Sequence, residues 1–193
     1  MHRHRHRAAL AAVLGLAGAM LSSGTSLADD SQAASPAQGT WQSHKYTFQF
    51  LGFTSTYSCD GLADKLRLLL LAAGARPDVK SQPGACARGF GRPDKFARAD
   101  LVFSTLKPLE GTAPPDAKTA NGQWRSVKLG WHSPMELQLG DCELVEQFKS
   151  QLLPMFTTRN VVSNTTCVPY QESGSTIDLE FDVFAAVPVK KKG

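Results

Sequence analysis

Two leucine-rich segments, each with a cysteine near its start, constrain most strongly how this chain can fold. The first, "YSCDGLADKLRLLLL", covers 57–71, and the second, "GDCELVEQFKSQLL", covers 140–153. Apolar residues recur every three or four positions in both, which is the spacing of a helix face packed on a core. We therefore predict a first helix between a Ser58 cap and Gly74, and a second over 142–156 with Asp141 as its cap.

Each predicted helix stands among segments with strand patterns. Aromatic and polar residues alternate in "KYTFQFLGF" (45–53), and apolar and acidic residues alternate in "STIDLEFDVFAAV" (175–187), as in strands with one buried face. The loop 107–123, rich in Pro, Gly and Ala, separates two halves. Further strands are predicted over 75–86, 99–106, 124–131 and 158–168. Both halves therefore read strand, helix, strand, strand.

This order predicts an α+β fold, a two-layer sandwich with two helices on one face of an antiparallel or mixed sheet. An internal β-α-β-β duplication, with half-repeats of about 40–107 and 123–188, stays open. An offset of 82 residues aligns Leu62 with Leu144 and Leu66 with Phe148, but the cysteines need offsets of 83 and 81. Amphipathic helices resemble one another for physical reasons, so the match does not decide between duplication and coincidence.

The first residues have the three-part layout of a secretory signal peptide. A basic "HRHRHR" precedes 14 apolar or small residues (8–21) and a small-residue "SLA" that ends at Ala28. The apolar run is shorter than the roughly 20 residues that span a bilayer. We predict cleavage after Ala28, a disordered lead-in over 29–39, one domain over 40–193, a periplasmic or secreted location and no membrane span after cleavage.

Removal of residues 1–28 takes away three arginines and no acidic residue. The remaining chain then carries 18 Lys and Arg against 17 Asp and Glu, compared with 21 against 17 in the full sequence. An almost neutral protein lacks the basic surface that nucleic-acid binding requires. We therefore expect no nucleic-acid partner.

The four cysteines of an exported chain usually form two disulfides, and three pairings are open. A strand that returns beside the helix start would bring Cys59 near Cys86 and Cys142 near Cys167, so this pairing is favoured. The alternative is thiol chemistry, because the positive end of a helix dipole favours a thiolate. No Cys-x-x-Cys pair and no zinc-type spacing occurs, so we assign no metal ligand.

One loop carries cations and aromatic residues around glycines, "ARGFGRPDKFAR" (87–98). Such a loop suits contact with an anionic ligand or a partner protein, and it equally suits a solvated loop whose long side chains cover the sheet. The predicted contact residues are Arg88, Phe90, Arg92, Lys95 and Arg98.

No catalytic motif accompanies these features. Asp178, Glu180 and Asp182 alternate along the last strand and form either a cation-binding row or a solvated sheet face with cross-strand basic residues. Beyond the predicted signal, the histidines are His44 and His132, and neither belongs to a recognisable triad. We assign no catalytic residue and no cofactor.

Three phrases, "YSCDGL", "GDCELVEQF" and "FTTRNV", resemble segments of small exported bacterial periplasmic proteins of the proteobacterial type, a functionally uncharacterised group. The resemblance covers about 57–183 and implies a periplasmic address but no chemistry. We expect a non-catalytic, disulfide-stabilised domain that binds an envelope protein or an anionic ligand. The alternative is a periplasmic enzyme, either thiol-dependent through Cys59 or Cys142 or a hydrolase without a recognisable motif.

Overall fold

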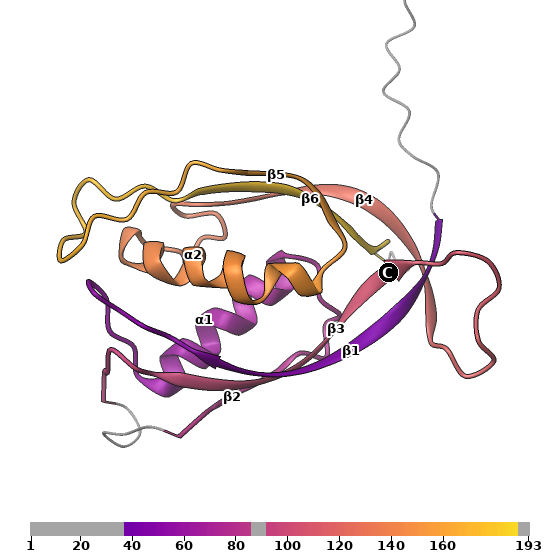
Figure 1. Cartoon of the computed structure of the whole chain (residues 1–193), viewed down its shortest axis with the longest axis horizontal. Coiled ribbons are helices and arrows are strands. Elements are labelled where there is room, and N and C mark those ends of the chain that lie inside the picture. Colours follow the sequence, from indigo (N-terminus) through magenta and orange to yellow (C-terminus); the bar gives the residue numbers. More distant parts are fainter. Residues whose placement is uncertain (1–36, 86–91, 189–193) are drawn as a thin grey trace, which may run out of the picture. The chain divides into compact units, whose positions relative to one another are not determined.

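Six strands form one sheet in the computed structural model, which describes residues 37–85 and 92–188 (Figure 1). All of these residues belong to one compact unit of the chain, 33–193. In chain order the elements are β1 (Ala37–Gln49), α1 (Cys59–Ala72), β2 (Lys80–Pro83), β3 (Arg98–Pro108), β4 (Thr119–Gly130), α2 (Cys142–Gln151), β5 (Thr158–Ser163) and β6 (Asp178–Ala186). Short 3-10 helices cover Leu139–Asp141 and Leu153–Met155.

The sheet is antiparallel throughout, and its strand order is β2-β3-β1-β4-β6-β5. The predicted α+β class is therefore confirmed. The two outer triplets, β2-β3-β1 and β4-β6-β5, meet where 37–40 of β1 pair with 119–122 of β4. Beyond this short junction, β1 stays paired with β3 and β4 stays paired with β6, so the sheet is split along its middle.

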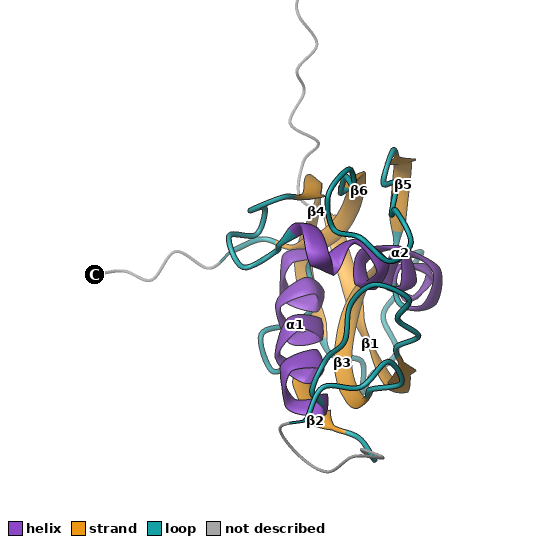
Figure 2. Cartoon of the chain, turned by 90° about the vertical axis from the view of Figure 1, so that its left-hand side faces the viewer, coloured by secondary structure: helices purple, strands orange, loops and turns teal. Residues whose placement is uncertain are grey.

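Helix α1 begins and ends as its sequence predicts. The Ser58 side chain accepts a hydrogen bond from the Gly61 N–H, which satisfies one of the free donors of the first turn. At the other end Gly74 has a φ of +99°, and the Gly74 and Ala75 N–H groups bond to the Leu71 and Leu70 carbonyls. This is the Schellman arrangement that glycine favours at a helix end. The helix packs against β2 and β3 (Figure 2).

Helix α2 is shorter than predicted, because it ends at Gln151 rather than at 156. Pro154 explains the difference, since proline has no N–H to donate and its ring clashes with the carbonyl four residues earlier. The chain continues as the 3-10 helix Leu153–Met155. Leu152 and Phe156 are still buried, so the apolar pattern identified the core residues correctly although the helix ends before them.

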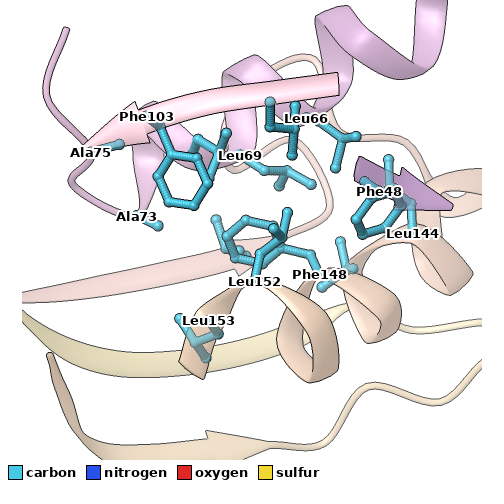
Figure 3. Packing of buried hydrophobic residues seen from close by; sticks show 14 of the residues in the cluster. Phe48, Leu66, Leu69, Ala73, Ala75, Phe103, Leu144, Phe148, Leu152 and Leu153 are labelled. Atoms are coloured by element: carbon cyan, nitrogen blue, oxygen red, sulfur yellow. The ribbon is translucent and has the colours of Figure 1, made fainter. Parts of the chain in front are cut away.

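One apolar cluster joins both helices to the sheet (Figure 3). Phe48 of β1, Phe103 of β3 and Phe148 of α2 lie in it, together with four leucines of α1, and each of these side chains is at most 2 % exposed. Each such side chain contributes about 1.5–3 kcal/mol relative to an exposed one. This cluster therefore fixes α2 beside the split in the sheet.

Strand β1 differs from the prediction at both ends. It begins at Ala37, inside the expected lead-in, and it ends at Gln49 rather than at 53. Pairing explains the early start, since Gly39 lies opposite Pro108 of β3 and Ala37 opposite Gly122 of β4. The predicted signal peptide and cleavage site lie outside the described residues. Within 37–85 and 92–188, no helix has the length and apolar character needed to cross a membrane.

Candidate functional site

Cysteine chemistry is structural at Cys142, which forms a disulfide with Cys167 as predicted. The two Cα atoms are 5.6 Å apart, and the bridge ties the start of α2 to the segment that follows β5. Cys59 is also disulfide-bonded. Its predicted partner, Cys86, lies outside the described residues.

The predicted cationic loop lies only partly within the described residues. Arg88 and Phe90 fall outside them, and Arg92, Lys95 and Arg98 are exposed. Phe96, from the same loop, is 55 % exposed and lines a cavity that none of these three cations lines. Phe96 thus connects this loop to the site described below.

The acidic row on β6 has basic and amide partners on the neighbouring strands. Lys128 of β4 forms ion pairs with Asp178 and Glu180, and Arg159 of β5 forms one with Asp182. The Asn164 amide and then Lys128 hold the pKa of Asp178 below its usual value, and the Asn160 amide followed by Arg159 does the same for Asp182. This is the solvated sheet face with cross-strand partners. Among the described residues, no group of three or more His, Cys, Asp or Glu side chains is placed to hold a metal ion.

The two histidines lie in unrelated places. The Nε2 atom of His44 lies 2.8 Å from the Thr105 hydroxyl, which itself donates to the Met155 carbonyl, so the ring nitrogen is the donor. Burial lowers the pKa of His44. His132 is exposed on the turn after β4 and lies against Trp131, with the two rings tilted by 44°. His44 therefore belongs to the packing of the strands.

The split in the sheet leaves one edge of β1 free. The Phe50 and Gly52 N–H groups donate to carbonyls on the β3 side, and residues of an antiparallel strand bond alternately to one side and the other. The backbone N–H and C=O groups of the odd-numbered residues of β1 therefore point away from β3. Trp41 still bonds to the Lys118 carbonyl at the junction with β4. In the part of β1 that follows Trp41, the outward backbone groups have no hydrogen-bond partner in the described part of the chain. These groups belong to Ser43, Lys45, Thr47 and Gln49.

A cavity of about 800 Å³ lies beside this free edge. Thr47, Gln49 and Leu51 line it from β1 and the residues that follow, and Glu146 lines it from α2. Cys167 lines it as well, so the Cys142–Cys167 disulfide helps to build its wall. We call this space the β1–α2 cavity. It is of the size that ligand sites commonly have.

Polar side chains spaced one turn apart on α2 set the width of the cavity. Gln151 accepts a hydrogen bond from the Tyr46 hydroxyl, and the Gln147 amide both accepts from the Leu51 N–H and donates to the Leu51 carbonyl. Glu143 accepts from the N–H groups of residues 53–55. Residues four apart lie on one helix face, so this stripe holds α2 alongside the end of β1 and its continuation, with the two segments running antiparallel. α2 thus lies between β1 and β5 (Figure 1).

Asp141 is the N-cap residue of α2, as predicted, but its side chain is a buried hub and does not cap the helix by a hydrogen bond. Its side chain makes no capping hydrogen bond to α2, and the residue is 4 % exposed. It accepts hydrogen bonds from the Tyr57 hydroxyl, from Lys65 Nζ at 2.7 Å and from the Gln138 N–H at 2.8 Å. Asp141 ends the 3-10 turn before α2, and its carboxylate bonds to Tyr57 and Lys65 instead of to the first turn of α2. The network ties the starts of the two helices together.

The residues that build the cavity were missed at the sequence level. The sequence pattern predicts Leu51 and Phe53 within a strand, yet they follow β1 and are 46 % and 53 % exposed. The available signals were the aromatic residues of "FLGF" around Gly52 and the Glu143, Gln147, Gln151 spacing on one helix face. Neither signal reveals a free strand edge, because strand pairing is not written in local sequence.

The chain matches no protein-family model, no curated protein and no solved structure. The β1–α2 cavity is therefore interpreted from its own geometry.

Proposed function

We propose that this chain is an exported, non-catalytic binding domain that receives an extended polypeptide segment along the free edge of β1. The observation that carries the proposal is that the outward backbone groups of four β1 residues have no partner among the described residues, and that two of these residues, Thr47 and Gln49, line the β1–α2 cavity. An unpaired strand edge is a template for another strand, and strand addition is a common mode of peptide recognition. The backbone would supply affinity, and the walls of the cavity would supply selectivity.

The matching edge of β4 is partly covered by its own chain, which supports β1 as the receiving strand. The Ser133 hydroxyl donates to the Lys128 carbonyl, and Gly130 and Ser133 exchange both backbone hydrogen bonds. The turn after β4 thereby covers this part of the edge. β1 has no corresponding cover among the described residues, since its continuation is held sideways by Gln147.

We further propose that the chain arose by a β-α-β-β duplication with both helices on one face of the sheet. The strand order supports this idea, because β1, β2 and β3 occupy positions that mirror those of β4, β5 and β6.

The proposed location is the periplasm of a bacterium, and the proposed partner is an envelope protein. The Cys142–Cys167 disulfide supports an oxidising compartment. An anionic ligand is less suited to this cavity, because Glu143 and Glu146 line it. A thiol-dependent enzyme is also less suited, because Cys142 and Cys59 are both disulfide-bonded.

A proline substitution tests strand addition directly. Thr47→Pro removes an outward N–H of β1 and leaves the bonds to β3 in place, which an edge strand tolerates. The matched control is Thr47→Ala, which keeps the N–H and loses the bond from the Thr47 hydroxyl to Asp100. Peptides selected from a random displayed library on the wild-type chain should bind Thr47→Pro at least tenfold more weakly than Thr47→Ala, because both variants lose the hydroxyl and only the proline loses the N–H.

Amide hydrogen exchange locates the bound peptide. Exchange at Lys45, Thr47 and Gln49 should slow on binding, while the bonded even-numbered amides of β1 should change little. Selected peptides that bind both variants equally, or that protect a different surface, would refute the proposal.

A further inference from the structure

Resting on the proposed function, we infer that the segment bound in the β1–α2 cavity is cationic and apolar. It would place a lysine or arginine opposite Glu146 and a large apolar side chain against Leu51, Phe53 and Phe96. The inference comes from the charge and exposure of the cavity walls.

The two carboxylates of the cavity differ in what they already bind. Glu143 receives the N–H groups of Phe53 and Thr54 at 3.0–3.2 Å, so its charge is satisfied by the backbone. Glu146 is half-buried in the same wall and has neither a hydrogen bond nor an ion pair with another described residue.

No lysine or arginine lines the cavity among the described residues. A partly desolvated carboxylate without a counter-charge favours a ligand that carries a positive charge, and it strongly disfavours a ligand that carries a negative charge. Glu146 is therefore the residue in this cavity that would discriminate between charged segments.

The apolar part of the cavity is unusually exposed. Leu51, Phe53 and Phe96 are 46 %, 53 % and 55 % exposed and line the same space. They come from two segments, the continuation of β1 and the loop before β3, which Tyr57 and Asp94 join through backbone hydrogen bonds in both directions. Large apolar side chains gathered beside an open strand edge mark an interaction site rather than a solvated loop.

The test uses octapeptides of alternating Thr and Val with an acetylated N-terminus and an amidated C-terminus. In each peptide two positions, two or four residues apart, are replaced by a pair of test residues: Lys and Phe, Gln and Phe, Glu and Phe, or Lys and Ser. A further Lys/Phe peptide carries methyl groups on the backbone nitrogens of every second residue, so that one edge of the peptide cannot donate hydrogen bonds. Affinities are measured by calorimetric titration into the wild-type chain and into Glu146→Gln. Glu110→Gln, which removes an exposed carboxylate outside the cavity, is the charge-matched control.

Lys/Phe should bind at least tenfold more tightly than Glu/Phe and about fivefold more tightly than Lys/Ser. Glu146→Gln should reduce the Lys to Glu ratio below threefold, and Glu110→Gln should leave it unchanged. The ratio should shrink as NaCl is raised, because exposed charge interactions are screened.

The outcomes separate the inference from the function on which it rests. Equal binding of Lys/Phe, Gln/Phe and Glu/Phe, with loss on N-methylation, would overturn the cationic preference and keep strand addition. No binding by any peptide, or binding insensitive to N-methylation, would overturn both. A dimer in sedimentation velocity that Thr47→Pro disperses would show that a second copy occupies the edge, which would also overturn the inference.

Discussion

Asp141→Asn should destabilise the protein strongly, although the residue lies outside the proposed binding edge. The carboxylate is 4 % exposed and accepts hydrogen bonds from Tyr57, Lys65 and Gln138. Breaking a buried ion pair costs about 3–5 kcal/mol, and a hydrogen bond to a charged group contributes about 1.5–3 kcal/mol. The Lys65 side chain is 24 % exposed and asparagine keeps one acceptor oxygen, so we expect a loss of about 2–4 kcal/mol.

A double-mutant cycle measures the coupling between Asp141 and Tyr57. Urea unfolding followed by circular dichroism gives the free energies of unfolding of the wild type, Asp141→Asn, Tyr57→Phe and the double variant. The two residues share a hydrogen bond, so the losses should fail to add by about 1 kcal/mol or more. A loss below about 0.5 kcal/mol for Asp141→Asn, or additive losses, would refute the hub.

The contact between Tyr57 and Asp141 also predicts how the stability of the protein depends on pH in the alkaline range. Burial, followed by the Asp141 charge, raises the pKa of Tyr57 above its usual value. The folded chain then keeps the phenol proton where the unfolded chain has lost it, so stability should fall as the pH rises above about 10. Tyr57→Phe should remove this part of the pH dependence, and an unchanged profile in that variant would contradict the assignment.

Three further changes test the fold. Replacing Cys142 and Cys167 together by alanine opens a loop with a sequence separation of 25, which should lower the free energy of unfolding by about 3.5 kcal/mol in urea; a loss below about 1 kcal/mol would contradict this role. Phe148→Ala empties a fully buried position and should cost about 3–5 kcal/mol by the same assay, whereas the exposed Val162→Ala should change stability by less than about 0.5 kcal/mol. The pKa of Asp182 is lowered in the folded chain, so its ionised side chain contributes stability above the unfolded pKa, and this stability is lost as the pH falls through the folded pKa. In thermal melts from about pH 5 to 2, the melting temperature of Asp182→Asn should therefore fall less steeply with pH than that of the wild type. The same steepness in both proteins would argue against the pairing of Asp182 with Asn160 and Arg159.

Local pattern determined much of this protein. The three- and four-residue spacing of leucines, with Ser58 and Gly74, fixed both ends of α1, and alternation along 177–183 fixed the buried face of β6. These features are local, because a side chain's face depends only on the period of its own element. The Cys142–Cys167 pairing was also predictable, since a short strand-helix-strand unit limits which cysteines can meet.

Tertiary structure alone decided where the candidate site lies. The β1–β4 pairing stops after Thr40, and this long-range register leaves the later part of β1 without a second neighbour. Asp141 had the sequence of a helix cap and became a hub because Tyr57 and Lys65 approach it from the other half. Pairing and burial depend on residues some 80 positions apart, whose contacts are set by packing of the whole core rather than by the local sequence. The sequence by itself therefore determined the elements and their buried faces, and the tertiary structure determined the open edge and the cavity beside it.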